Sequence, residues 1–453
     1  MIREMFPEME IRQCGDMQEP MELLELPGIS LDYFLRGLAG EAYQDNAVFQ
    51  ELYSWYLQSP EYRILVKKLT EASFSERPSD KIGKTVAKIL YGEISPYSAT
   101  RLERFAACAF AHFLQYGLKV TERAEYEFRA MDMGNVMHMA LEKFAVEVRK
   151  EGLDWAELTE EERNRIIDSC LDQVSADYGN TVLKSSARNE YMLERTRRIL
   201  RRTVWALQEQ LKHGAFRPEG FEVRFQGGRI DRVDIMEEPE NNRVYVKVID
   251  YKTGNTSFDL LALYHGLQLQ LMVYLDGALQ VEKRKYPDRE IVPAGVFYYN
   301  VKDPMIQEKI HADMESINEQ MLKKMKMNGL VQADDNMSTK IDSTMASIPV
   351  SLNRDGSFSK RSSVASRKQF DVLGAYVRRK ICDIRESILD GNAAVEPYEL
   401  GKKNACTYCP YLTVCGFDRK IPGYEFHRLS SIGEDALWKK IMKGEEENGS
   451  EMD

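Results

Sequence analysis

The chain has 453 residues, of which 43% are hydrophobic and 30% charged, and its net charge at pH 7 is −10. This composition excludes a largely disordered chain and supplies apolar material for a sizeable core, and the length suggests two to four domains. No stretch approaches the roughly 18 uninterrupted apolar residues of a transmembrane helix. Residues 1–9 lack the apolar run of a signal peptide. The sequence therefore predicts a cytoplasmic protein without a membrane partner.

The acidic excess is distributed unevenly. Residues 1–100 hold 10 basic and 16 acidic side chains, and the segment from Lys443 to Asp453 holds one lysine and five acidic side chains. The long central part of the chain is therefore close to neutral. A neutral body can still carry a basic groove that binds nucleic acid.

The first half of the chain has the pattern of helices. Leucine and aromatic residues recur at helical spacing through residues 1–95. Ser98 is a good N-cap for a helix ending near Gly117, and another helix is expected over residues 132–150. A charged helical region continues to about Lys212 and contains a run of arginines: Arg195, Arg197, Arg198, Arg201 and Arg202. This run indicates either a solvated helix face or a stripe that contacts phosphates.

Strand patterns replace helical ones after residue 220. Alternating or continuous apolar runs predict strands over residues 222–225, 229–235, 244–250 and 294–299. A helix over residues 265–279 is expected between the last two strands, and residues 333–368 are polar and serine-rich, as in a long loop. This order predicts an α/β protein with a mixed central sheet flanked by helices.

A carboxylate–lysine arrangement stands at the end of the third strand. Asp250 and Lys252 are two positions apart and project from the same strand face, and Tyr251 between them turns into the core. Asp231 lies on the preceding strand of the expected hairpin, so its carboxylate can meet that of Asp250. Two converging carboxylates favour Mg²⁺ or Mn²⁺, which would polarise a phosphoryl oxygen and lower the pKa of water.

Together with a helix that carries His138, this arrangement resembles the RecB-type branch of the PD-(D/E)XK nuclease superfamily, whose core is restriction-endonuclease-like. The resemblance implies that His138, Asp231 and Asp250 bind the metal, with the Tyr251 carbonyl completing the shell. It also implies that Asp231, Asp250 and Lys252 are catalytic. The family's catalytic glutamine falls on Gln268 or Gln270, and we assign the role to Gln270 because it keeps the family's spacing to a tyrosine, Tyr274.

Three of the seven cysteines cluster near the C-terminal end, as Cys406-x2-Cys409-x5-Cys415. In a reducing compartment this spacing indicates a metal site that needs a fourth ligand, and either zinc or an iron–sulfur cluster satisfies four thiolates. The candidates for the fourth ligand are Cys14, Cys108, Cys170 and Cys382.

One distant cysteine with this C-terminal triplet resembles the iron–sulfur staple of the AddB family, a 4Fe–4S cluster. The strings Ser98-Ala99-Thr100-Arg101-Leu102-Glu103 and Cys409-Pro410-Tyr411 add to the likeness, which covers about residues 75–420. The resemblance implies cluster ligands Cys108, Cys406, Cys409 and Cys415. We therefore expect a helical remnant of a helicase-like region over residues 1–95, a nuclease domain over 96–425, and an acidic, disordered tail over 426–453.

This likeness also implies a function. The chain would be a Mg²⁺-dependent single-strand DNA exonuclease domain, paired with an AddA-like helicase–nuclease subunit, that processes double-strand DNA ends for recombinational repair. Two alternatives remain open at the level of sequence. One is a catalytically silent scaffold that binds DNA ends, and the other is an iron–sulfur nuclease of the CRISPR-adaptation type.

Overall fold

The computed structural model describes residues 27–39, 47–73, 81–92, 98–123, 130–177, 186–306, 313–334, 336–421 and 423–449. The chain divides into two units, Met1–Ser79 and Asp80–Asp453. The described part of the first unit consists of helices α2 (Pro27–Ala39), α3 (Ala47–Gln58) and α4 (Arg63–Ser73). These helices pack around Phe34, Leu52, Tyr56 and Val66. The helical pattern expected for this region is confirmed over these residues.

The second unit is built on a mixed sheet of six strands in the described part of the chain. The strands follow the chain order: β1 (Arg217–Phe225), β2 (Gly228–Glu238), β3 (Arg243–Lys252), β4 (Glu290–Asn300), β5 (Asn328–Gln332) and β6 (Val364–Ala365). The pairs β1–β2, β2–β3 and β4–β5 are antiparallel, and β3–β4 and β5–β6 are parallel. The expected mixed α/β core and the four expected strands are confirmed.

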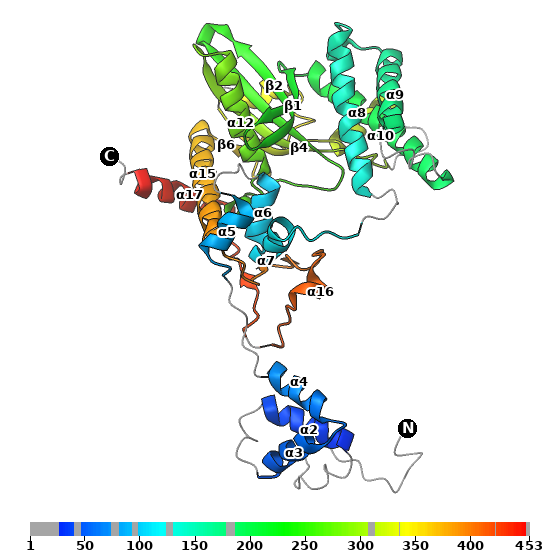
Figure 1. Ribbon diagram of the computed structural model, residues 1–453. Helices are drawn as coiled ribbons and strands as arrows, with labels where there is room; N and C mark the ends of the chain where they lie inside the picture. Colours follow the sequence, from blue (N-terminus) through cyan, green and yellow to red (C-terminus); the bar gives the residue numbers. More distant parts are fainter. Residues whose placement is uncertain are drawn as a thin grey trace, which may run out of the picture. The chain divides into compact units, whose positions relative to one another are not determined.

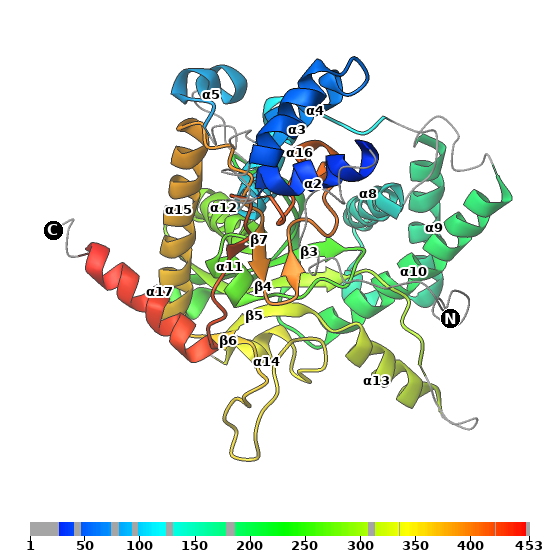
Figure 2. The ribbon, with the colours of Figure 1, turned by 90° about the horizontal axis from the view of Figure 1, so that it is seen from below.

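Helices cover both faces of this sheet (Figures 1 and 2). Side chains of β3 alternate between the two cores: Tyr245 and Ile249 pack with α8 (Ala130–Lys150), α9 (Glu160–Asp177) and α10 (Ala187–Lys212). Val246 and Val248 pack on the other face, with α12 (Gln270–Lys285), α15 (Arg367–Leu389) and α17 (Glu434–Gly449). The sheet is thus buried on both sides, which explains the nearly continuous apolar sequence of β3.

The two ends of this unit lie against each other. The N-terminal end contributes α5 (Lys84–Tyr91), α6 (Ala99–Ala107), α7 (Ala109–His112) and the π-helical turn η3 (Phe113–Gly117). The backbone N–H of Ile82 donates to the carbonyl of Gly391, and that of Phe110 donates to the carbonyl of Ala394, at 2.8 and 3.0 Å. Ser98 caps α6 as expected, because its hydroxyl accepts the N–H of Arg101.

The remaining elements are short. They are η4 (Trp155–Glu157), η6 (Pro239–Asn241), α11 (Leu260–Tyr264), α13 (Met314–Lys324), α14 (Met337–Ile341), β7 (Tyr398–Leu400), β8 (Lys403–Asn404), α16 (Leu412–Cys415) and β9 (His427–Arg428). Strands β8, β7 and β9 form a second small sheet. No helix in the described residues is long and apolar enough to cross a membrane.

Three expectations about elements need correction. The single helix expected from Ser98 to Gly117 is interrupted at Cys108, whose backbone is extended. The helix expected over residues 265–279 starts at Gln270 instead, because Gly266 adopts a left-handed φ of 78° that ends α11. The segment 333–368 is mainly loop, as expected, but it also contains α14 and β6.

The disorder expected for residues 426–453 is wrong over α17. Leu437, Trp438 and Ile441 are buried in the same core as α15. Their spacing places these three side chains on one helix face, and burying that face outweighs the negative charge that follows it. Residues 450–453 lie outside the described residues.

Candidate active site

The ends of β2 and β3 bring the two predicted carboxylates together. Arg232 pairs with Ile249 across the antiparallel ladder, so Asp231 stands opposite Asp250. The N–H of Tyr251 donates to Oδ2 of Asp231 at 2.8 Å, which fixes that carboxylate against the end of β3. Tyr251 itself is buried in the core, as its position in the strand predicts.

Lys252 is held between Asp250 and the first residue of α12. Its Nζ lies 2.7 Å from Oδ2 of Asp250 and donates to Oε1 of Gln270, also at 2.7 Å. The amide nitrogen of Gln270 in turn donates to the hydroxyl of Tyr274 at 2.9 Å. Of the two candidate glutamines, Gln270 therefore contacts the lysine.

The side chain of Gln268 forms hydrogen bonds with a neighbouring loop. Its side-chain oxygen accepts the N–H of Asp259 at 2.7 Å, and its amide nitrogen donates to the carbonyl of Ser257 at 2.9 Å. These bonds hold together the turn that leads into α12. Gln268 is thus placed as a loop residue.

Glu103 is a half-buried carboxylate beside the site, and the sequence pattern did not predict it. One of its oxygens accepts the N–H groups of Leu269 and Gln270, at 2.7 and 2.9 Å. It thereby caps the N-terminus of α12, where a negative charge is favourable. Burial nevertheless raises the pKa of Glu103 to about 7. Its only sequence signal is the family-like string from Ser98 to Glu103.

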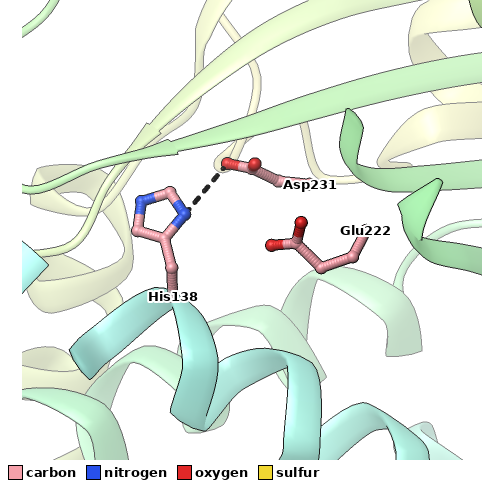
Figure 3. A group of neighbouring side chains, drawn as sticks. All are labelled: His138, Glu222 and Asp231. Atoms are coloured by element: carbon pink, nitrogen blue, oxygen red, sulfur yellow. Dashed lines mark ion pairs between the residues drawn. The ribbon is translucent and has the colours of Figure 1, made fainter. Parts of the chain in front are cut away.

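The helix α8 adds His138, and β1 adds a further carboxylate, Glu222. Nδ1 of His138 lies 3.3 Å from Oδ2 of Asp231. Among the described residues, ligand atoms of His138, Glu222 and Asp231 lie within 4.8 Å of one another (Figure 3). The sequence pattern predicts Glu222 only as one residue of a strand. Pairing β1 with β2 in register places Glu222 opposite Asp231, and this pairing is the signal that could have identified Glu222 as a site residue.

Burial perturbs the ionisation of this whole group. It raises the pKa of Asp231 and of Asp250 to about 6, and for Asp250 the neighbouring Asp231 adds to the rise. Burial also raises the pKa of Glu222 to about 7 and lowers the pKa of His138. Several shifted groups meeting at one place are typical of functional sites. One nitrogen and several carboxylate oxygens, brought together with little water, fit the donor set of a divalent cation.

The four cysteines predicted as cluster ligands are also neighbours. Cys108, at the break between α6 and α7, and Cys409 line one small core with Tyr411. Burial raises the pKa of the Cys406 thiol to about 11, and Cys108, Cys409 and Cys415 are close enough to add to the rise. Of the other cysteines, Cys170 is buried in the core beside α8 and Cys382 is exposed, whereas Cys14 lies outside the described residues.

Four of the five arginines of the run on α10 form ion pairs on the protein surface. Arg197 and Arg201 pair with Asp168 of α9, and Arg197 also reaches Asp172 at 2.6 Å. Arg198 and Arg202 pair with Asp303 at 2.7 and 3.3 Å. These pairs join α10 to its neighbours and favour the structural interpretation of the run over a stripe that contacts phosphates.

Comparison with known proteins agrees with this geometry. Residues 96–416 match the PD-(D/E)XK nuclease superfamily, and the chain belongs to that superfamily. The fold expected from the sequence is thereby confirmed.

The chain is also similar to one particular kind of protein, the B subunit of an ATP-dependent helicase/deoxyribonuclease. It is 38% identical to that of Lachnoclostridium phytofermentans and 32% identical to that of Alkaliphilus metalliredigens, in each case over 98% of its length. Identity to the corresponding protein of a Thermoanaerobacter species is 33% over 90% of the chain. The aligned part spans only 40%, 41% and 37% of these relatives. The resemblance to AddB that the sequence predicts is confirmed.

Proposed function

We propose that this chain provides the nuclease domain of a cytoplasmic helicase–nuclease complex that degrades DNA strands while double-strand ends are processed for recombinational repair. The partner would be an AddA-like helicase–nuclease subunit, and the activity a Mg²⁺- or Mn²⁺-dependent exonuclease. The observation that carries the proposal is the convergence of Asp231, Asp250 and Lys252, joined to Gln270 and faced by His138. The relatives, subunits of ATP-dependent helicase/deoxyribonucleases, support the assignment to such a complex.

The residues present fit a divalent cation. His138, Asp231, Asp250 and the carbonyl of Tyr251 would hold it, because Asp250 is buried, Asp231 beside it is only 11% exposed, and the single positive charge of Lys252 does not balance two carboxylates. When bound, the ion supplies Lewis acidity toward the phosphate and lowers the pKa of water.

Lys252 supplies positive charge to the reaction. The Lys252 side chain is 28% exposed and its ammonium group is fixed by Asp250 and Gln270, so it can meet a phosphate of the DNA. There it would offset the negative charge that grows on the phosphoryl oxygens as water attacks. Asp250 pairs with the ammonium group of Lys252, and Gln270 orients it. A catalytically silent scaffold has no need for this complete arrangement.

We further propose that Cys108, Cys406, Cys409 and Cys415 bind a 4Fe–4S cluster. The likeness to the AddB family supports a cluster over a single zinc ion, although four thiolates would satisfy either metal. The cluster would join the two ends of the nuclease unit, which already contact each other.

The nuclease proposal is tested by two substitutions. We expect Asp250→Ala and Lys252→Ala each to abolish Mg²⁺-dependent cleavage of single-stranded DNA by the full chain, alone or with its partner subunit, while the circular dichroism spectrum is unchanged. Asp276→Ala and Lys323→Ala are matched controls, because both side chains form surface ion pairs. Cleavage at the wild-type rate by either active-site variant would contradict the proposal.

A further inference from the structure

Glu222 stands directly opposite Asp231 in the β1–β2 ladder. Phe221 pairs with Arg232 and Val223 with Ile230, which leaves Glu222 facing Asp231 across the two strands. Figure 3 shows both carboxylates and the ring of His138 converging on one point from β1, β2 and α8. Asp250 is not part of this group within 4.8 Å in the described residues, since its carboxylate turns toward Lys252.

This placement of Glu222 is unfavourable in the protein alone. Its side chain is 8% exposed and that of Asp231 11%, and like charges directly opposite each other destabilise a sheet. Glu222 also has a left-handed φ of 49°, which a glutamate rarely adopts. Arg229 pairs with Glu222, but Arg229 is 57% exposed, so water screens much of this attraction. The second carboxylate therefore remains incompletely compensated.

We propose that Glu222 is a further protein ligand for the divalent cation of the nuclease site, on the side where His138 and Asp231 lie. The inference rests on the proposed metal-dependent function and adds a residue to it. One imidazole nitrogen and two carboxylate oxygens suit Mn²⁺ or Mg²⁺. A doubly charged ion between the two carboxylates converts their repulsion into attraction. It also replaces Arg229 as the main counter-charge of Glu222.

The competing explanation is that Glu222 serves only to hold Arg229. Two variants separate these roles, because Glu222→Gln removes the carboxylate whereas Arg229→Met removes only its partner. If Glu222 binds the ion, the first variant weakens metal binding and the second does not. If Glu222 only positions Arg229, the two variants have the same effect.

The test is Mn²⁺ binding to the full chain, followed by electron paramagnetic resonance of the unbound ion, together with thermal melting without metal. We expect Glu222→Gln to weaken Mn²⁺ binding at least tenfold. Its metal-free melting temperature should equal or exceed that of the wild type, since a like-charge pair is removed. Arg229→Met should stay within twofold of the wild-type affinity. The same is expected of Glu219→Gln, whose carboxylate on the same strand pairs with Lys285 at 3.0 Å.

The possible failures are distinguishable. If Glu222→Gln binds Mn²⁺ within twofold of the wild type, Glu222 is not a ligand, and the nuclease proposal is unaffected. If the wild-type chain binds no Mn²⁺, metal dependence fails and this inference fails with it. Should Glu222→Gln melt earlier without metal, Glu222→Asn provides the same comparison, because asparagine tolerates a left-handed backbone.

Discussion

Lys252 owes its position to groups from three separate elements. Asp250 on β3 and Gln270 on α12 contact its ammonium directly, and Glu103 on α6 fixes Gln270 through the first turn of α12. Glu103 is thus a positioning residue, since it acts on the lysine through Gln270. Its carboxylate is the main acceptor for the N-terminal N–H groups of α12.

We expect Glu103→Ala to lower kcat for DNA cleavage about tenfold, because Gln270 loses the group that orders its backbone and then holds Lys252 less firmly. The loss of stability should be about 1 kcal/mol, as for other helix caps. Mn²⁺ affinity should not change, since no proposed ligand is altered. Glu103→Gln keeps an accepting oxygen and should restore most of the activity. Steady-state cleavage kinetics and Mn²⁺ binding together measure these effects.

Asp259 provides the control for Glu103. Its carboxylate caps α11 by accepting the N–H groups of Leu261 and Ala262, at 3.0 and 3.1 Å, without contacting Lys252. Asp259→Ala should therefore cost similar stability and leave kcat unchanged. Equal losses of kcat in the two Ala variants would show that Glu103 acts only through stability.

Residue spacing by itself reveals the site only where it is local, and the distant His138 is predicted only through the family resemblance. Asp250 and Lys252 share a strand, and the hairpin brings in Asp231, so period-two geometry predicts their convergence. Glu103 and Glu222 have no such local signal: Glu103 lies on a helix more than 100 positions away, and Glu222 has the pattern of any polar residue in an alternating strand. The roles of all these residues stay predictions until the substitutions are made.

At the scale of elements, α6 and α7 show a tertiary contact overriding local propensity. Residues 99–113 have the pattern of one continuous helix, yet the chain is extended at Cys108, and the N–H of Phe110, two positions on, bonds to Ala394. The break aims Cys108 toward the C-terminal cysteines. Local pattern cannot predict it, because the partner lies almost 300 positions further along the chain.

The helix α17 gives a prediction about stability. Leu437 is 1% exposed and packs in the core shared with α15. Leu437→Ala should lower the free energy of unfolding by about 2–5 kcal/mol, as for other buried leucines. Lys440→Ala, on the exposed face of the same helix, should change it by less than about 0.5 kcal/mol. Urea denaturation of both variants measures the difference, and equal effects would contradict the packing of α17.

At the scale of the whole molecule, the pattern of the sheet was the easiest feature to predict. In strands β1 to β4, apolar residues either alternate with polar ones or form continuous runs, as a sheet covered on both faces requires. The order of the strands in the sheet follows their order in the chain. The contact between the two ends of the nuclease unit is harder to predict from the sequence. Its two ends meet through backbone hydrogen bonds such as Ile82 to Gly391, which leave no trace in composition or periodicity.

The proposed cluster turns this contact between the two ends into a covalent one. Cys108 and Cys406 are 298 positions apart, and closing so long a loop stabilises the folded state by several kcal/mol in the chain-entropy description. The protein purified without oxygen should therefore be brown and contain about four iron and four sulfide per chain. Cys409→Ala should lose the colour and lower the melting temperature of the nuclease unit, whereas Cys382→Ala, at an exposed thiol, should do neither. A colourless protein that contains one zinc ion would show that the four cysteines bind zinc and not an iron–sulfur cluster. If Cys409→Ala melts at the same temperature as the wild type, the cysteine site does not stabilise the nuclease unit.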